Sequence, residues 1–330
     1  MRDPGVSVAD IRAAADRLRP HLTRTPLLRS WSLDQRCQGE IFLKAENLNP
    51  GGSVKLRGVL NRLLDEKAGA KGLTRPVVSY GPTNFCLSLA MAANQLGTMA
   101  HLVMPEGTSP RDLDAVRRHG GEVHPFDPQN EHKEEWAAEW AEHHGALVLA
   151  PYDDPLMMAG YGTAGLEIAD EMGRLGHHFD QVLVCCASGG LAAGIGLAIH
   201  ADHPGASLIT VEPRGFDDMK RSLIAGSRVN NAPGGTSLCE ALLAPSPSAM
   251  AFPILRHLRA RGVAVSDRET LAAMRFALEE LRVVLEPSGA VALAAVLYGY
   301  VQTRGKRTVV LLSGGNSPPN ALGEAMTLSG

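Results

Sequence analysis

Short apolar runs alternate with helical stretches along most of the chain, and this alternation restricts the fold more than any other feature of the sequence. The first series of apolar runs covers residues 77–80, 101–104, 122–125 and 146–150, with helical stretches over 87–96, 111–119 and 134–143. The second series covers 181–186, 208–212, 263–266 and 308–313, with helical stretches over 191–199, 270–281 and 290–298. Strands that alternate with helices form parallel sheets covered on both faces. The sequence therefore predicts an α/β protein with two lobes, each an open, mostly parallel sheet flanked by helices.

Size and charge indicate a protein that handles a small molecule. The chain has 330 residues, 45% of them hydrophobic, which suits one large or two coupled domains. The net charge of −3 comes from 32 basic and 35 acidic residues without long runs, so neither nucleic acid nor an anionic membrane is an expected partner. The uncharged window 182–199 is long enough to suggest a membrane span, but its central glycines favour a strand, a turn and a helix.

Cysteine usage predicts a reduced, cytoplasmic protein. The five cysteines are odd in number and lack zinc-site spacing, and the N-terminus has no apolar signal core. The twelve histidines are also expected to be surface residues without ligand spacing. The cysteines are Cys37, Cys86, Cys185, Cys186 and Cys239.

The segment 43–58, LKAENLNPGGSVKLRG, places Lys55 at the start of a predicted helix. A short buried strand precedes it, 49–52 breaks the chain, and Ser53 is expected to cap the helix. The positive end of the helix dipole disfavours an ammonium at this place. Only a neutral amine attacks a carbonyl, so Lys55 is a candidate Schiff-base lysine. The local physics alone is also compatible with a solvated surface lysine.

The spacing within this segment resembles the cofactor attachment segment of fold-type II pyridoxal-phosphate enzymes, in the branch of the serine/threonine dehydratases and serine racemases. The residues that carry the resemblance are Lys44, Glu46, Pro50, Gly52, Ser53, Lys55, Arg57 and Gly58. The resemblance runs from Val6 to about Asn316. It implies a tryptophan synthase beta-like fold, with 1–75 plus 152–330 as a large cofactor-binding domain and 76–151 as a small substrate-side domain. A homodimer is expected.

A run of small residues between a predicted strand and a predicted helix, 185–194, is a candidate phosphate-binding turn. A dinucleotide-binding unit that ends at Glu212 and simple close packing are the alternatives; the GxGxxG spacing is not met. In the family this place holds a tetraglycine loop around the cofactor phosphate. The resemblance therefore assigns cofactor contacts to Ala187, Ser188, Gly189, Gly190 and Leu191.

Three further residues are implied as cofactor contacts. By resemblance, Asn84 forms a hydrogen bond with the phenolic oxygen of the cofactor, and Ser313 forms one with the pyridine nitrogen of the cofactor. A neutral hydroxyl does not hold that nitrogen protonated, so the ring is a weaker electron sink, which favours β-elimination over transamination. Glu286 begins Glu-Pro-x-Gly-Ala, a family segment near the cofactor, but a helix-start carboxylate followed by Pro has the same pattern.

A cation site is a second expectation from the resemblance. The segment 211–218 is similar to the divalent-cation segment of serine racemase-like members, which implies Glu212, the carbonyl of Phe216 and Asp218 as ligands. Carboxylates and a carbonyl suit a hard cation such as Mg²⁺. A solvated acidic loop is the alternative.

The substrate-binding loop departs most from the family. Gly81-Pro82-Thr83-Asn84-Phe85 stands where Ser-Ser-Gly-Asn-His is usual. Pro82 has no N–H to donate, and it replaces the serine that acts as a base in serine racemase, so racemisation through this residue is not expected. Ser53, Gly81, Thr83, Asn84 and Phe85 are the candidate substrate contacts. Together with Val54 and Cys239-Glu240-Ala241, these changes suggest a substrate other than plain serine or threonine.

The sequence thus predicts a pyridoxal-phosphate-dependent dehydratase that performs α,β-elimination on an L-β-hydroxy amino acid and yields a 2-keto acid and ammonia. Lys55 would take the Cα proton. The alternatives are a related enzyme for phenylserine or 3-hydroxyaspartate, an NAD-dependent oxidoreductase, and a catalytically silent relative that binds the cofactor.

Overall fold

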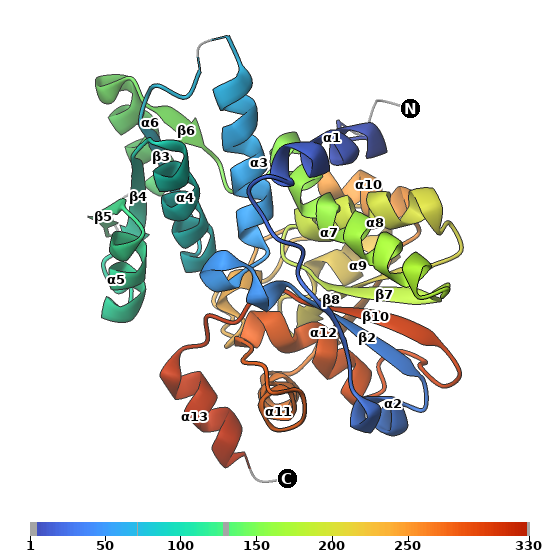
Figure 1. The fold of residues 1–330 in the computed structure, drawn as a ribbon. Helices are drawn as coiled ribbons and strands as arrows, with labels where there is room; N and C mark the ends of the chain where they lie inside the picture. Colours follow the sequence, from blue (N-terminus) through green and yellow to red (C-terminus); the bar gives the residue numbers. More distant parts are fainter. Residues whose placement is uncertain (1–4, 71, 128–131, 329–330) are drawn as a thin grey trace.

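The computed structural model describes residues 5–70, 72–127 and 132–328 and contains two sheets with helices around them (Figure 1). The six-stranded sheet has the order β1-β2-β10-β7-β8-β9, and only the β1–β2 pair is antiparallel. Its strands are β1 (Leu27–Arg29), β2 (Glu40–Ala45), β7 (Gln181–Cys185), β8 (Ser207–Pro213), β9 (Arg261–Val265) and β10 (Arg307–Leu312). The four-stranded sheet has the order β5-β4-β3-β6 and is parallel throughout. Its strands are β3 (Val77–Tyr80), β4 (Ala100–Pro105), β5 (Gly121–Phe126) and β6 (Leu147–Leu149). The predicted fold class is confirmed.

The helices cover both sheets and fill the space between them (Figure 1). Those of the first half are α1 (Val8–Leu18), α2 (Trp31–Cys37), α3 (Lys55–Ala68), α4 (Thr83–Leu96), α5 (Pro110–Arg118) and α6 (Lys133–His144). Those of the second half are α7 (Pro155–Arg174), α8 (Gly190–Asp202), α9 (Asp218–Ala225), α10 (Ala251–His257), α11 (Asp267–Phe276), α12 (Pro287–Leu297) and α13 (Pro319–Thr327). Residues 277–281 continue α11 as a π-helical turn.

Helix α7 is absent from the sequence prediction, although with 20 residues it is longer than any other helix in the described part of the chain. Its glycines have low helix propensity but let neighbouring helices approach closely. A Cβ at Gly160 would lie 2.5 Å from the carbonyl oxygen of Arg57, and one at Gly194 of α8 would lie 2.3 Å from that of Met158. Helices α3 and α8, which begin at the two main candidate cofactor segments, are therefore both packed against α7.

Strand β2 joins the sheet built by the C-terminal half, because it pairs in parallel with β10 from Glu40↔Arg307 to Ala45↔Leu312. The pairing favours the predicted grouping of residues 1–75 with 152–330, which stays a prediction. The chain just beyond both strands is joined as well: the N–H of Val54 donates to the carbonyl of Ser313 (3.0 Å), and Ser53 bridges to Gly314. This pairing brings the segment before Lys55 against the end of β10.

A buried ion network holds the first turns of α3. Arg57, 2% exposed, pairs with the Glu46 carboxylate (Nε to Oε2, 2.7 Å) and with Glu167 of α7 (Nη1 to Oε1, 2.7 Å). Lys44 of β2 reaches Glu167 at 2.8 Å and Glu171 at 3.1 Å. Each buried charge has an opposite partner, which such groups require when they are removed from water. The network fixes α3 relative to β2 and α7.

The four strands of the second sheet all lie between residues 77 and 149, and α6 covers one face of this sheet. On that face a small cluster of buried apolar residues, separate from the main core, joins the sheet to the helix: Val78, Val103, Phe126, Ala137 and Ala141. The division into a large domain (1–75 plus 152–330) and a small one (76–151) stays a prediction, which this composition of the second sheet favours.

Two local expectations need correction or completion. Ser53 does not cap α3, because the helix begins at Lys55 with Val54 as its N-cap; the Ser53 Oγ accepts a hydrogen bond from the Lys55 N–H (3.3 Å). The window 182–199 is divided between β7, a turn and α8, as predicted. Among the described residues, no helix combines the length and the apolar character that a membrane crossing requires.

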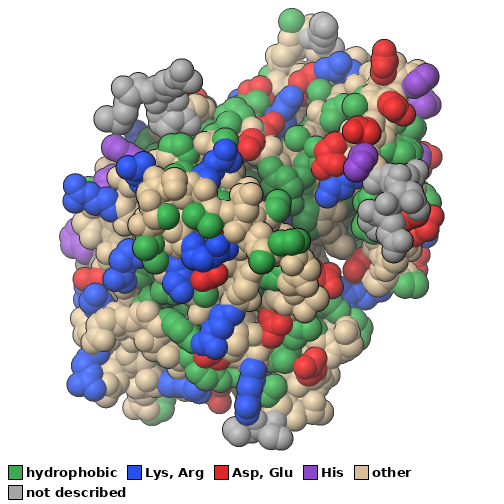
Figure 2. Space-filling view, turned by 180° about the vertical axis from the view of Figure 1, so that it is seen from behind, with side chains coloured by type: hydrophobic (Ala, Val, Ile, Leu, Met, Phe, Trp, Pro, Cys, Tyr) green, Lys and Arg blue, Asp and Glu red, His purple; other side chains and the backbone are tan. Residues whose placement is uncertain are grey.

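The surface carries charges of both signs. On the face shown in Figure 2, Lys and Arg side chains lie among Asp and Glu side chains. This distribution agrees with the nearly balanced composition of the chain.

Candidate active site

Lys55 lies in a cavity formed where α3, α7 and α8 begin. The cavity has a volume of about 750 Å³, its open mouth included. Its walls come from residues 151–154, three side chains of α7, the turn 187–191, residues 241–242 and Ser248. Pro82 and Phe85, at the start of α4, complete it on the side of the second sheet.

The surroundings of Lys55 favour the neutral amine. Burial lowers the pKa of Lys55, and the nearby Cys185 and Glu286 offset only part of that effect. The Lys55 Nζ lies 5.2 Å from the centre of the Tyr161 ring. The Tyr161 hydroxyl is buried and has no hydrogen-bond partner in the described structure. An amine with a lowered pKa is the form that attacks a carbonyl.

The turn 187–191 suits an anionic group. Gly189 is the N-cap of α8 with φ +105°, a backbone conformation that side chains rarely adopt, and a Cβ there would lie 2.6 Å from the Met219 methyl carbon. The Ser188 carbonyl accepts a hydrogen bond from the Ser248 N–H (2.8 Å), which anchors the turn. The first N–H groups of a helix have no partner within the helix and bind anions. The turn therefore fits a phosphate, and it borders the same cavity as Lys55.

Asn84, Glu286 and Ser313 lie beside this cavity and are not part of its described lining. The Asn84 amide donates to Glu286 Oε1 (2.7 Å), and the Asn316 amide donates to Asn84 Oδ1 (2.8 Å). Burial raises the pKa of Glu286 to about 7, although Asn84 and Lys55 act in the opposite direction. The Ser313 Oγ accepts a hydrogen bond from Cys185 Sγ (3.2 Å), and Cys185 lines the cavity.

The candidate substrate contacts are only partly brought together. Phe85 lines the cavity, and Gly81 packs close to it: a Cβ at Gly81 would lie 3.2 Å from the Phe85 ring. Thr83 is the first residue of α4, and Pro82 is its N-cap without a side-chain cap. Ser53 lies next to Lys55, because its Oγ accepts a hydrogen bond from the Lys55 N–H (3.3 Å). Thr83 and Ser53 are not among the described cavity-lining residues.

The three expected cation ligands lie away from the cavity, between β8 and α9. Both Glu212 carboxylate oxygens accept backbone N–H groups, from Met219 and from Lys220, each at 2.8 Å. Asp218 Oδ1 accepts from the Asn231 amide (2.6 Å), whereas Asp218 Oδ2 is buried without a partner. Burial raises the pKa of Asp218 to about 6. Asp218 thus has an unused oxygen for a cation, and Glu212 already has partners for both of its oxygens.

Some functional candidates escaped the sequence analysis. The cavity wall from Met157 had no local signal, because it depends on how α7 is placed. The expectation that the histidines lie on the surface without ligand spacing is wrong for two of them. His101 and His124 are 12% and 20% exposed at the side chain, and with Glu122 they bring three ligand atoms within 4.8 Å of one another. Glu122-Val123-His124 was a readable signal, since alternate residues of a strand share a face.

Comparison with known proteins agrees with this arrangement. The model of the family described as "Pyridoxal-phosphate dependent enzyme" matches residues 18–314. The chain is 35% identical to an L-threonine ammonia-lyase of Geobacter sulfurreducens over 93% of this chain and 74% of that one. It is 34% identical to an L-threo-3-hydroxyaspartate ammonia-lyase of Pseudomonas sp, over 94% and 95% of the two chains. The structure of maize serine racemase superimposes with a TM-score of 0.88 at 29% identity, covering 98% of this chain and 97% of that one.

The chain therefore belongs to the family of pyridoxal-phosphate-dependent enzymes. The predicted family, fold class and cofactor are confirmed, and the dinucleotide-binding alternative for the turn 187–191 is set aside by the family match.

Proposed function

We propose that this enzyme eliminates the β-hydroxyl from an L-β-hydroxy amino acid and yields a 2-keto acid and ammonia. The observation that carries the proposal is that a lysine with a lowered pKa and an anion-binding helix start border one cavity. The names of the ammonia-lyase relatives support the same class of reaction.

Pyridoxal phosphate, when bound, supplies an electron sink for the charge that develops at the substrate Cα. We assign its aldehyde to Lys55 and its phosphate to the turn 187–191 (Ala187, Ser188, Gly189, Gly190 and Leu191). Asn84 would hold the phenolic oxygen, Glu286 would lie near it, and Ser313 would contact the ring nitrogen. Lys55, once free, would accept the Cα proton, because burial keeps its amine in the form that takes up a proton.

The contact between Cys185 and Ser313 supports elimination over transamination. Burial raises the pKa of Cys185, so its thiol stays protonated and donates to Ser313 Oγ. The Ser313 hydroxyl hydrogen is then left to donate to the ring nitrogen. A nitrogen that accepts a hydrogen bond stays unprotonated, and the ring is then a weaker sink, suited to the expulsion of a β-substituent.

The start of α4 is the proposed site for the substrate carboxylate. The N–H groups of Thr83 and Asn84 belong to the first turn of α4 and have no partner within the helix, whereas those of Phe85 and Cys86 donate to the Pro82 carbonyl. A carboxylate at this helix end is also favoured by the helix dipole. Gly81 and Phe85 would shape this side of the pocket, with Ser53 holding the backbone of Lys55.

The cavity favours an uncharged β-substituent. In the described lining, Lys55 is the one basic side chain, while Asp153 and Asp154 are acidic and Phe85, Met157 and Tyr161 are apolar or aromatic. A second carboxylate would meet no basic side chain in this lining beyond the lysine that is needed for chemistry. We therefore favour a threonine- or phenylserine-type substrate over 3-hydroxyaspartate, with a preference in kcat/KM on the order of tenfold or more, about the value of one unpaired polar contact.

A divalent cation at Glu212, the Phe216 carbonyl and Asp218 is a further part of the proposal. The unpartnered Asp218 Oδ2 supports it. Addition of Mg²⁺ to chelator-treated protein should raise the melting temperature of the wild-type chain and leave that of Asp218→Asn unchanged. An equal response of both proteins would remove these ligands from the proposal.

We also propose a cytoplasmic homodimer. The five cysteines are free and buried, which suits a reducing compartment. Trp31 and Ile224 are 74% and 79% exposed, large apolar side chains of the kind that subunit contacts cover. Light scattering on the purified protein measures the mass; a monomer at micromolar concentration would refute the dimer.

The first experiment is an absorption spectrum of the purified protein, followed by a panel of threonine, serine, phenylserine and 3-hydroxyaspartate with keto acid as the readout. A near-visible cofactor band together with keto-acid release from an uncharged substrate is expected. A protein with this band that is inert toward every candidate would be the catalytically silent relative. Release from 3-hydroxyaspartate alone would overturn the choice of substrate but not the reaction.

A further inference from the structure

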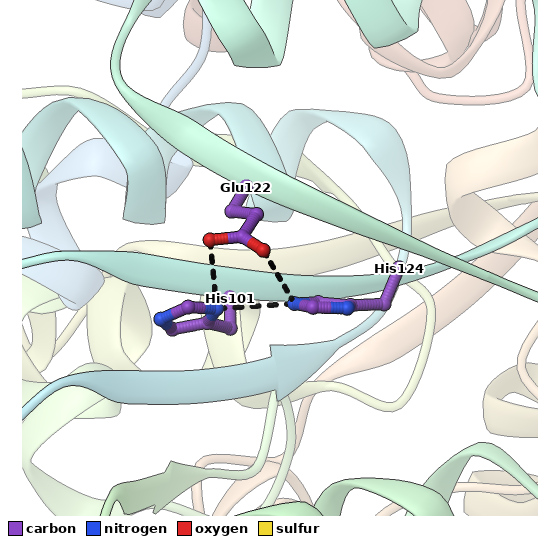
Figure 3. A group of neighbouring side chains, drawn as sticks. All are labelled: His101, Glu122 and His124. Carbon is purple, nitrogen blue, oxygen red and sulfur yellow. Dashed lines mark hydrogen bonds and ion pairs between the residues drawn. The ribbon is translucent and has the colours of Figure 1, made fainter.

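Two histidines and a glutamate gather on the face of the second sheet that α6 covers (Figure 3). His101 of β4 lies beside Glu122 of β5 in the parallel register, and His124 follows two residues later on β5. Alternate residues of a strand point to the same face, so the pairing places all three side chains on one side of the sheet. No part of this group belongs to the lining of the Lys55 cavity.

The two imidazole nitrogens and the Glu122 carboxylate lie at separations close to those of a tetrahedral metal site, with one carboxylate oxygen facing each histidine. The His101 Nδ1 lies 3.0 Å from the His124 Nε2 and 3.5 Å from Glu122 Oε2, and the His124 Nε2 lies 3.8 Å from Glu122 Oε1. Ligands held tetrahedrally at ~2.0–2.1 Å from Zn²⁺ stand about 3.3–3.4 Å apart, the geometry of three corners of a tetrahedron. The observed separations lie on both sides of this value, so an ion fits after small side-chain rotations.

The surroundings hold the imidazoles and leave one side open. The Trp140 ring lies 4.1 Å from the His101 ring, and the Trp136 ring lies 5.0 Å from the His124 ring, centre to centre. These indoles restrict the orientation of both ligands. Glu122 is 57% exposed at its side chain, whereas the imidazoles are mostly covered, so the carboxylate marks the side from which an ion and a water ligand would enter.

We propose that His101, Glu122 and His124 bind one Zn²⁺ ion, with water as the fourth ligand. Two imidazole nitrogens and a carboxylate select a borderline transition metal over Mg²⁺ or Ca²⁺, which prefer oxygen ligands alone. The alternative is a plain hydrogen bond between the two imidazoles, which needs one proton between them. On binding, that hydrogen moves to the other ring nitrogen of the same imidazole, so each neutral imidazole presents a lone pair to the ion without net release of a proton.

The place of the site in the fold indicates a stabilising role. His101 and Glu122 are the second residues of their strands, whereas the Lys55 cavity lies beyond the carboxyl ends of β3 and β7. Strand β5 is the edge strand of its sheet. An ion shared by β4 and β5 therefore ties the edge strand to its neighbour, and binding to the folded state alone raises its stability.

The test is calorimetric titration of Zn²⁺ into the chelator-treated holoenzyme, in two buffers with different ionisation enthalpies. One Zn²⁺ ion per chain and nearly the same binding heat in both buffers are expected, because both imidazoles bind as neutral ligands. Co²⁺ in place of Zn²⁺ should give the strong visible bands of tetrahedral coordination, while the cofactor band stays unchanged.

Three ligand variants and two controls decide the assignment. His101→Gln, His124→Gln and the exposed Glu122→Gln should each weaken Zn²⁺ binding by about 100-fold or more. His143→Gln and His200→Gln, which change exposed histidines of α6 and α8, should bind as the wild type does. Glu122→Gln keeps the test valid if a histidine variant does not fold. Absence of a binding step in the wild-type protein, or equal affinity in Glu122→Gln, would overturn the proposal.

Discussion

The two sheets of this enzyme differ in how completely they are buried. Every residue of β7 is buried, and in β10 only the first is not. In β5 the four residues between Gly121 and Phe126 are exposed or half-buried, and the separate cluster between this sheet and α6 has five buried apolar residues, two of them on α6. The turn 187–191 and Ser313 therefore follow strands whose side chains are almost all buried. The second sheet, in contrast, accommodates polar side chains such as His101.

Besides the packing of α4 on α3, hydrogen bonds from α4 and α5 join the two regions. The Asn84 amide at the start of α4 donates to Glu286, the N-cap of α12, and the Arg111 guanidinium of α5 donates to the carbonyls of Asn316 and Ser317. We expect changes on the six-stranded side to affect both catalysis and stability, and changes at the second sheet to have smaller effects.

The largest effect should come from Lys55→Ala. Loss of the amine to which we assign cofactor attachment and proton transfer should lower kcat by about 10⁴-fold or more. Steady-state kinetics and the loss of the near-visible band check this. Lys67→Ala, at the other end of α3, is the matched control and should keep both. Full activity in Lys55→Ala would refute the assignment.

Glu286→Gln tests the junction through the pH dependence of the unfolding free energy. Burial raises the pKa of Glu286 from 4.5 to about 7, so the folded state binds its proton more tightly than the unfolded chain does. Its ionisation therefore costs stability: the penalty is absent below about pH 4.5, grows as the pH rises, and is complete above about pH 7, with an upper value of about 3 kcal/mol.

In Glu286→Gln, the unfolding free energy should no longer fall as the pH rises from about 4.5 to 7. Urea unfolding between pH 4.5 and 7.5 measures the difference between wild type and variant, and the exposed Glu279→Gln serves as the control. The same slope in the wild type and in Glu286→Gln would show that this carboxyl does not titrate in that window.

Gly194→Ala tests the close packing of the six-stranded side. The added methyl group would lie 2.3 Å from the Met158 carbonyl oxygen, and the variant should lose about 1–3 kcal/mol of unfolding free energy. Gly173→Ala, in the open part of α7, should instead gain about 0.5–1 kcal/mol, because alanine favours a helix. Thermal and urea unfolding measure both; a stable Gly194→Ala would contradict the tight contact of α7 with α8.

The smallest effect is expected from Tyr161→Phe. The Tyr161 hydroxyl is buried without a partner, so its removal should leave unfolding free energy unchanged or raise it by up to about 1 kcal/mol. Calorimetry measures the stability. A loss of stability would show that this hydroxyl has a partner in the folded enzyme.

By itself, the sequence determined the class of fold and indicated the residue that we propose as the centre of the chemistry. Apolar runs located the strands of both sheets, because a strand that is buried on both faces has apolar residues at consecutive positions. Lys55 could be placed in a first helical turn for the same reason: the break at 49–52 and the apolar periodicity after it are local. The family resemblance then brought Asn84, Glu286 and Ser313 into consideration.

The tertiary structure alone decided which side chains meet. Helix α7 was hidden because its glycines, poor helix formers, serve contacts with distant segments such as Arg57. Cys185 touches Ser313 across 128 positions of the chain, and His101 reaches His124 through the register of two parallel strands. Parallel pairing joins segments that are far apart in sequence, and its register depends on the packing of the whole lobe. The local propensity of a segment therefore cannot predict which distant strand it pairs with, or in which register.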